Sequence, residues 1–415
     1  MGTRHSPHRR PDSRGPHLTR YRALMLIMLA LAATSDSSAQ RRDVVGYYLA
    51  SEYTARDTLV TPLTLPYEKL TIINYAFFYP RPDGHLVGRT PGIDEVILEG
   101  LRDPITGAVR KETALCSVAH SRGVKVLLSL GGWEESGNFP AVAAAPDGRR
   151  VFTASCADLI RRYEFDGIDI DWEYPGYAPH NGTPQDGENF LLMLRELRDT
   201  LNVLGGLTGK QLLITIAIPT APSLVAAYDV RAIVPLLDFL NLMTYDIYGA
   251  WDSLSNHNTP LFPSADSDPS RCIDAGFRLF RDTYGIPADR INIGTAFYGR
   301  TYKNCTELRM PHNGSDAANF PPDGTPRYYA ILAAKDRCSR RWDDHAKVPY
   351  LVCPDGNSLV SYDDEESTTL KARYVIDNGV RGIIIWELTG DYLRNRRTPL
   401  LDAIHTAFTS APRAK

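Results

Sequence analysis

The chain has 415 residues, enough for one large barrel domain or two domains of ordinary size. Its 43% hydrophobic and 23% charged residues are typical of a globular protein and exclude a disordered or fibrous chain. Residues 1–39 hold six Arg and two Asp, so the rest of the chain carries 40 basic and 47 acidic residues, a net charge of −7. That balance argues against nucleic acid or another polyanion as a partner.

The first 39 residues predict a secretory signal peptide. Six Arg and three His lie within residues 1–22, an 11-residue apolar run occupies residues 23–33, and the small residues Ser37 and Ala39 are spaced for cleavage before Gln40. The apolar run is too short to span a bilayer. We therefore expect a secreted protein, or a periplasmic one in a bacterium, with no membrane association after cleavage. An uncleaved anchor or a mis-assigned start is the alternative.

Eight short β-rich apolar runs follow in chain order, and helix-length segments separate them. Amphipathic helical patterns at 187–204 and 274–285 are examples of these segments. Apolar strands that alternate with helices predict a parallel sheet covered on both faces, and eight such units fit an α/β fold of the (β/α)8 TIM-barrel type. A doubly wound open sheet is the alternative, but no Gly-rich phosphate loop follows the first run. The runs are 44–50, 70–78, 124–133, 165–173, 211–219, 237–246, 291–300 and 380–391.

About 80 residues separate the seventh run from the eighth, too many for a bare loop. We predict a small α+β insertion domain at 302–367, with the (β/α)8 barrel formed by 40–301 and 368–415. The six cysteines include no CxxC pair, so zinc and thioredoxin-like sites are disfavoured. An exported protein can form disulfides, and we expect at most one or two, without assigning the pairs.

The fourth run, within FDGIDIDWEYPG, places three acids two residues apart: Asp169, Asp171 and Glu173. On a strand these side chains share one face, which in a barrel is the face toward the axis, while the intervening Ile168, Ile170 and Trp172 face the helices. Glu173 is the outermost, at the carboxyl end where barrel enzymes act.

Crowded carboxylates in a partly dry site cannot all ionise, so at least one pKa must rise and leave a proton for general acid catalysis. The alternative is a Ca²⁺ or Mg²⁺ site, but a rigid strand does not wrap a cation as a flexible loop does. We therefore expect acid catalysis without a metal or cofactor.

The segment DGIDIDWE resembles the DxxDxDxE signature of family 18 glycoside hydrolases, the chitinases, with Asp166 as its first acid. SLGGW (129–133), MTYD (243–246), FYGR (297–300) and IIIWE (383–387) are similar to other motifs of that family, in the same order. The resemblance extends from about residue 44 to 391. The insertion resembles that of the family's deep-cleft branch.

The resemblance implies a catalytic role for each acid and for Tyr245. Glu173 donates a proton to the glycosidic oxygen, and the substrate's own 2-acetamido group is the nucleophile. Asp171 orients that group and stabilises the oxazolinium ion, swinging between Asp169 and Glu173. Tyr245 hydrogen-bonds the acetamido oxygen, and Ser129 and Tyr47 hold Asp169 from behind. Retention of anomeric configuration would follow.

The resemblance also implies a row of substrate-binding residues. Trp386 forms the floor under the sugar, because the C–H face of a sugar packs well on an indole ring. Arg300 could equally serve as a structural ion-pair partner. The other expected members are Trp133, Trp251 and Tyr75 as further platforms, and Met243, Asp246, Tyr298, Arg300 and Tyr47 as lining.

The function we expect is that of a monomeric, exported chitinase that cleaves β-1,4 bonds in chitin or N-acetylglucosamine oligosaccharides. An endo-β-N-acetylglucosaminidase or a peptidoglycan hydrolase with the same chemistry is one alternative. A chitinase-like lectin that binds sugar without cutting it is another. Such lectins typically lack the terminal acid of the motif, and here Glu173 is present.

Overall fold

The computed structural model describes residues 1–5, 42–354 and 357–410. Most of the predicted signal peptide, residues 6–39, lies outside the described residues. Within the described ranges, no helix combines the length and the apolar character needed to cross a membrane.

Eight parallel strands form a closed barrel, which confirms the predicted TIM-barrel fold and excludes the open sheet. Their order is β1-β15-β10-β9-β8-β7-β6-β2, and β1 also pairs with β2 to close the ring. A short antiparallel strand, β3 (Leu86–Gly88), extends β2. The barrel strands are β1 (Asp43–Leu49), β2 (Ile72–Pro80), β6 (Lys125–Gly131), β7 (Gly167–Asp171), β8 (Leu213–Ile218), β9 (Phe239–Leu242), β10 (Ile291–Ala296) and β15 (Gly382–Trp386).

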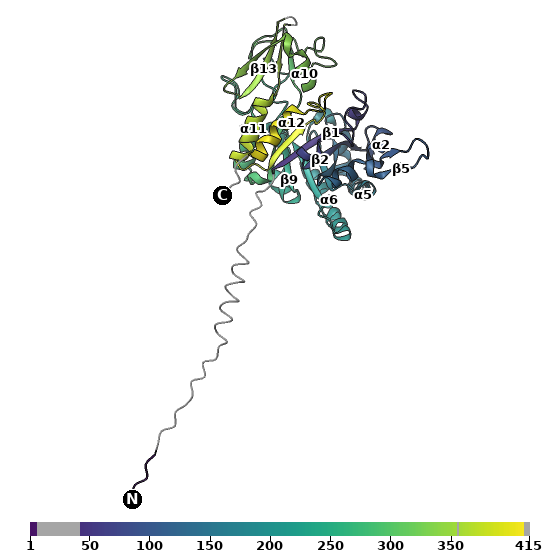
Figure 1. Ribbon diagram of the computed structural model, residues 1–415, viewed down its shortest axis with the longest axis vertical. Coiled ribbons are helices and arrows are strands. Elements are labelled where there is room, and N and C mark those ends of the chain that lie inside the picture. Colours follow the sequence, from purple (N-terminus) through teal and green to yellow (C-terminus); the bar gives the residue numbers. More distant parts are fainter. Residues whose placement is uncertain (6–41, 355–356, 411–415) are drawn as a thin grey trace. The chain divides into compact units, whose positions relative to one another are not determined.

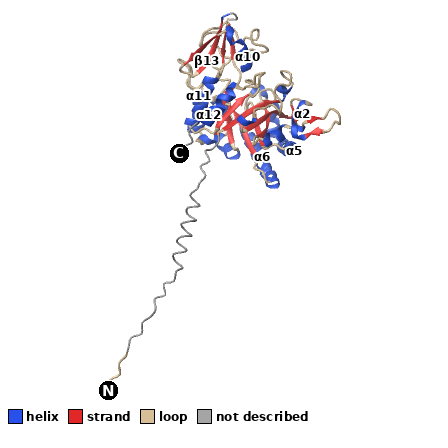
Figure 2. Cartoon of the chain, in the orientation of Figure 1, coloured by secondary structure: helices blue, strands red, loops and turns tan. Residues whose placement is uncertain are grey.

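Helices surround the strands, as Figure 2 shows in blue around red. The helix expected at 187–204 is α6, and the one expected at 274–285 is α9 with a π-helical continuation at Leu279–Thr283. A small hairpin, β4 (Leu101–Arg102) with β5 (Val109–Arg110), follows α2 (Figure 1). The helices are α2 (Ile93–Glu99), α3 (Leu115–Ser121), α4 (Phe139–Ala144), α5 (Pro146–Tyr163), α6 (Asp186–Thr208), α7 (Pro222–Val225), α8 (Val230–Ile233), α9 (Ile273–Arg278), α11 (Glu365–Asp377) and α12 (Pro399–Ser410).

The strands bury apolar side chains on both faces. On β7 and just beyond it, Ile168, Ile170 and Trp172 face outward into the large core between sheet and helices, where Trp172 stacks on Phe139 with ring centroids 5.3 Å apart. A smaller apolar cluster fills the barrel interior and includes Tyr47. The outward position of these three residues confirms the predicted alternation and leaves the inward face to the acids.

An antiparallel four-stranded sheet lies between β10 and β15 in the chain, in the order β11-β14-β13-β12. Its strands are β11 (Arg300–Lys303), β12 (Ser339–Asp343), β13 (Val348–Cys353) and β14 (Ser358–Ser361), and one helix, α10 (Tyr328–Ala334), accompanies them (Figure 1). These elements lie in the long gap of the pattern, and the insertion domain at 302–367 stays a prediction. The first strand begins two residues before the predicted boundary at 302.

One disulfide joins Cys338 to Cys353, across the paired ends of β12 and β13. The other four cysteines are buried and free. A single bridge lies within the predicted maximum of two.

Candidate active site

Asp169 and Asp171 of β7 and Glu173, two residues past its end, line the barrel axis with increasing exposure toward the carboxyl end. Asp169 is completely buried, Asp171 is nearly so, and Glu173 is half-buried. In β-strands, side chains two residues apart are separated by about 7 Å along the strand. The acids therefore form a ladder from the barrel interior to the open end.

Four uncharged donors surround the carboxylate of Asp169. Tyr47 Oη and Ser129 Oγ each donate to Oδ2 at 2.8 Å, while Thr215 Oγ1 and Asn241 Nδ2 donate to Oδ1. Burial raises the pKa of Asp169, and these hydrogen bonds oppose the rise because they stabilise the ionised form. The expected contacts from Tyr47 and Ser129 are present.

Thr215 and Asn241 were not predicted as site residues. Strand register explains their position, because Ser129 on β6 and Thr215 on β8 both lie directly beside Asp169. The available signal was a single polar residue at an inward position of an apolar stretch, in LLITIAIP and in FLNLM. Asn241 in turn accepts a hydrogen bond from Asn292 of β10.

Asp171 differs from Asp169 because its Oδ1 is buried and has no hydrogen-bond partner within the described residues. Burial raises the pKa of Asp171 well above its ordinary value, and the charges of Glu173 and Asp169 add to the rise. A dry carboxyl group between two other acids retains its proton. The prediction that at least one pKa rises in this cluster is therefore confirmed.

Glu173 has the properties of a general acid that works near neutral pH. Burial raises the pKa of Glu173 to about 7, a hydrogen bond with Tyr174 opposes the rise, and the charge of Asp246 adds to it. The main chain of Glu173 is held by Ser136, whose Oγ accepts its N–H at 2.8 Å. A carboxyl group with this pKa donates and recovers a proton readily at pH 7.

The close approach of β6 to β7 depends on glycine. Gly131 has φ +109° and lies beside Asp171 in the strand register. A Cβ atom at Gly131 would lie 2.3 Å from the Asp171 carbonyl oxygen, so any other residue would displace the strand that carries the acids.

Tyr245, Tyr298 and Arg300 gather around Asp246 after β9 and β10. Asp246 accepts hydrogen bonds from Tyr298 Oη at 2.6 Å and from Arg300 Nε at 2.8 Å, and its charge pairs with the guanidinium. The alternative reading of Arg300 as an ion-pair partner thus has direct support. Burial raises the pKa of Tyr245 well above its ordinary value, so its hydroxyl stays protonated and can donate a hydrogen bond.

Trp386, at the end of β15, lies among aromatic rings of the barrel interior. Its ring centroid is 5.3 Å from that of Tyr47, edge to face, and 5.7 Å from that of Phe77, which stacks at 26°. Met243 packs against the same cluster. This packing holds the indole against Tyr47, the donor to Asp169, and Phe77 is a member of the aromatic cluster that the sequence analysis missed.

Trp133 and Trp251 are each more than half exposed, at 51% and 59% of their surface. The Trp251 ring covers Gly249, where a Cβ atom would come within 2.4 Å of it, and the guanidinium of Arg300 lies 4.9 Å from its centroid. Large exposed indoles with one supported face are suited to bind sugar rings.

The prediction for Tyr75 is wrong. Tyr75 is completely buried in the core between sheet and helices, where it stacks on Phe165 and donates a hydrogen bond to Asp94 at 2.5 Å. Its side chain is therefore on the outer face of β2, away from the acids.

Asp166, the first acid of the signature, also lies apart from the other three. Its carboxylate accepts the N–H of Val126 and contacts His120, before the start of β7. These contacts fix the strand's amino end, so Asp166 has a structural role.

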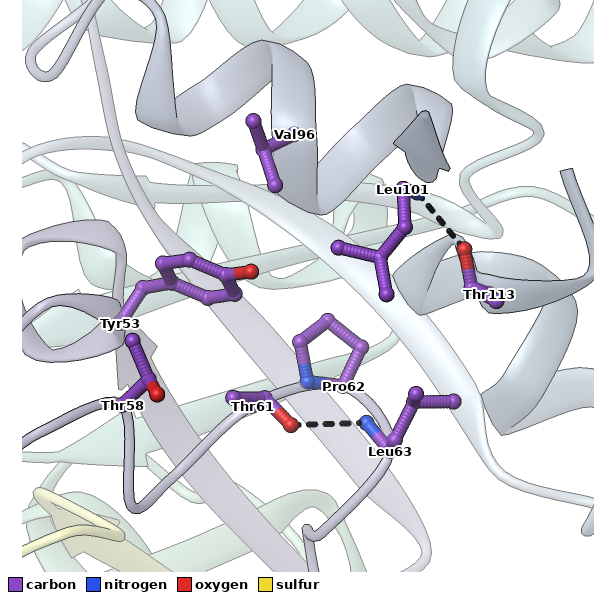
Figure 3. A pocket seen from close by; sticks show the side chains of 8 residues that line it. All are labelled: Tyr53, Thr58, Thr61, Pro62, Leu63, Val96, Leu101 and Thr113. Atoms are coloured by element: carbon purple, nitrogen blue, oxygen red, sulfur yellow. Dashed lines mark hydrogen bonds between the residues drawn. The ribbon is translucent and has the colours of Figure 1, made fainter. Parts of the chain in front are cut away.

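A small hollow of about 250 Å³ lies elsewhere, between the loop after β1 and the α2–β4 segment (Figure 3). Its lining does not include the acids of β7. The residues that line it are Tyr53, Thr58, Thr61, Pro62, Leu63, Val96, Leu101 and Thr113.

The sequence pattern of Glycosyl hydrolases family 18 matches residues 43–391. The chain belongs to this family. Chitinase A1 of Niallia circulans is 33% identical over 80% of this family 18 chain and 50% of its own length. A probable endochitinase of Caenorhabditis elegans is 36% identical over 65% of this chain and 44% of its own length. The chain thus spans about half the length of these two relatives.

Solved structures of family 18 proteins superpose on the described fold. Chitinase ChiA74 from Bacillus thuringiensis gives a TM-score of 0.78 at 27% identity, over 91% of this chain and 71% of that chain. The Group IV chitinase of Ostrinia furnacalis in complex with allosamidin gives 0.77 at 28% identity, over 89% of this chain and 99% of that one. Both agree with the barrel described above for this family 18 chain.

Proposed function

We propose that this chain is a secreted retaining glycoside hydrolase that cleaves β-1,4-linked N-acetylglucosamine polymers, chitin and its oligosaccharides, by substrate-assisted catalysis. The observation that carries the proposal is the difference between the three acids Asp169, Asp171 and Glu173. Only Glu173 combines access to the open end of the barrel with a pKa of about 7.

The other carboxylates near Glu173 are poor nucleophiles. Asp169 is buried under four donors, Asp171 retains a proton, and Asp246 is occupied by Tyr298 and Arg300. A retaining enzyme with a carboxylate nucleophile needs a second free acid at about 5–5.5 Å from the first, and family 18 is an exception to that scheme. The substrate's acetamido group supplies the nucleophile instead.

In the first step the acetamido carbonyl oxygen attacks the anomeric carbon while Glu173 protonates the departing glycosidic oxygen. The C–O bond breaks and a cyclic oxazolinium ion forms. In the second step Glu173, now ionised, takes a proton from the water that opens this ring, which restores the acid and retains the anomeric configuration.

Asp171 and Tyr245 hold the acetamido group during these steps. The unpartnered Oδ1 of Asp171 accepts the acetamido N–H, and the Tyr245 hydroxyl donates to the carbonyl oxygen. Asp171 turns from Asp169 toward Glu173, leaves its proton on Asp169, and in its ionised form stabilises the positive charge of the oxazolinium ion. Trp386 supports the sugar ring, with Trp133 and Trp251 as further platforms.

The export signal predicted at residues 1–39 supports action outside the cytoplasm, and we infer that the mature chain begins at Gln40 and is a monomer. N-terminal sequencing of the exported protein and its elution volume in gel filtration test these two points.

The decisive experiment is incubation of the purified protein with chitin hexasaccharide, with products and their anomers followed by NMR. Early β-anomeric products are the expected result. Binding without cleavage would indicate a lectin, and α-anomeric products would exclude the substrate-assisted mechanism.

We expect Asp246→Asn to move the alkaline limb of the kcat/KM profile to lower pH. Asp246 raises the pKa of Glu173, and its loss also leaves the Arg300 charge uncompensated, so both effects lower that pKa. Activity needs Glu173 in its protonated form. With a lower pKa, Glu173 loses its proton, and the enzyme its activity, at a lower pH. A kcat/KM profile between pH 4 and 10 measures the shift. The control is Asp158→Asn on the surface of α5; an unmoved limb in Asp246→Asn would contradict the assignment.

Tyr75→Phe should reduce stability without changing oligosaccharide affinity. The lost hydroxyl leaves Oδ1 of the buried Asp94 without its donor, while the Thr90 N–H still donates to Oδ2, and the unmade hydrogen bond costs about 1–3 kcal/mol. Trp386→Ala should instead weaken the affinity for the oligosaccharide. Denaturation midpoints and calorimetric titration with chitin hexasaccharide distinguish them, and weaker binding by a folded Tyr75→Phe would return Tyr75 to the site.

A further inference from the structure

The main chain of Glu173 is held from both sides by loops that follow two different strands. Ser136, in the turn after β6, accepts its N–H at 2.8 Å, and His180, in the turn after β7, contacts its carbonyl oxygen through Nδ1 at 2.6 Å. A carbonyl oxygen can only accept, so Nδ1 of His180 carries the proton. No role in the chemistry described above requires His180.

The same imidazole also supports an exposed indole. The ring centroids of His180 and Trp133 lie 4.6 Å apart, edge to face, and Tyr177 lies 5.2 Å from His180 on the same turn. Trp133 is 51% exposed, so the part of its ring that His180 does not cover is open to a ligand. One side chain therefore touches both the acid's peptide and the sugar platform.

The turn that carries His180 is itself fixed. The buried carboxylate of Asp186, at the start of α6, accepts the N–H groups of Gly176 and Thr183, on either side of His180. Asn181 donates a hydrogen bond from Nδ2 to the Gly137 carbonyl, which ties the turn to the loop after β6. His180 is thus held in place before any substrate binds.

We propose that His180 is a positioning residue that couples the sugar platform at Trp133 to the catalytic acid Glu173. Its hydrogen bond sets the peptide that aims the carboxyl group, and its ring sets the plane of the indole. This inference rests on the proposed function. Small misplacements of a catalytic group reduce turnover by up to about a hundredfold, so a fixed peptide has a direct effect on rate.

Two variants separate the two contacts. His180→Phe keeps a ring against Trp133 and removes the donor to the Glu173 carbonyl. His180→Asn keeps an N–H donor near the position of Nδ1 and removes the ring. Steady-state kinetics with N-acetylglucosamine oligomers of two to six units, next to Trp133→Ala, give kcat and KM for each.

For His180→Phe we expect kcat to fall about ten- to a hundredfold for every oligomer, with KM within about twofold of the wild type. For His180→Asn we expect kcat within about threefold and KM about three- to tenfold higher, only for those oligomers whose KM Trp133→Ala also raises. The double variant of His180→Asn and Trp133→Ala should bind no more weakly than Trp133→Ala alone.

If His180→Phe and His180→Asn changed kcat and KM in the same way, the proposal would be overturned. A purely structural histidine would give the two variants the same kinetic defect. Additive effects in the double variant would overturn it as well. If His180→Phe does not fold, the comparison of His180→Asn with Trp133→Ala decides alone. A wild type that cleaves no oligomer refutes the proposed function, and calorimetric binding by His180→Asn and Trp133→Ala then tests the coupling to the platform separately.

Discussion

A Glu173→Gln variant is expected to lose about 10²- to 10⁴-fold in kcat while it still binds chitin hexasaccharide with nearly unchanged affinity. The amide preserves the shape of the side chain but has no proton to transfer to the glycosidic oxygen. The raised pKa of Glu173 shows that its burial already favours an uncharged group, so the neutral amide should not disturb the fold. Single-turnover kinetics and calorimetry measure the two quantities.

Glu188→Gln is the matched control, because Glu188 is exposed in the first turn of α6. It should retain full activity. Turnover by Glu173→Gln within tenfold of the wild type would show that another group supplies the proton. Loss of binding together with turnover would show that Glu173 acts in substrate recognition.

Lys371→Met is expected to lower the free energy of unfolding by about 3–5 kcal/mol, the largest stability effect we anticipate. Lys371 on α11 and Asp363 after β14 are both completely buried, and Nζ donates to Asp363 Oδ1 at 2.7 Å and to Thr259 at 3.0 Å. Methionine fills the space of the lysine stem but leaves the Asp363 charge without a counterion. Urea denaturation monitored by tryptophan fluorescence gives the change.

The control for this pair is Arg161→Met, which breaks a solvent-exposed ion pair with Asp158 and should cost less than about 1 kcal/mol. The double variant of Lys371→Met and Asp363→Leu should recover part of the loss, since no buried charge remains. A double variant as unstable as Lys371→Met alone would show that packing of the lysine stem, and not charge, is what stabilises the fold.

Most of the barrel and of the acid ladder could be predicted because their signals are local. The alternation of Asp169, Asp171 and Glu173 with apolar residues determines which face each occupies, and strand polarity determines which acid is outermost. Tyr75 could not be placed in this way. Both faces of β2 are buried, so alternation carries no polar signal, and a register shift between Tyr75 and Phe78 puts Phe77 on the inner side instead.

Contacts between loops were beyond prediction for a different reason. Ser136 and His180 reach Glu173 from turns whose path depends on the assembled barrel, and neither residue type is distinctive in such a turn. Thr215 and Asn241 were detectable as lone polar residues within apolar runs. Their common target, Asp169, follows only from the strand register.

The antiparallel sheet between β10 and β15 has a practical consequence for protein engineering. Its first strand, β11, begins with Arg300, the partner of Asp246, and Arg327, which precedes α10, pairs with Glu387 directly after Trp386. The segment is therefore connected to the residues that follow β9 and β15 by charge as well as by the chain. A chimera that exchanges it for the corresponding segment of a relative must transplant Arg300 and Arg327 together with their carboxylate partners.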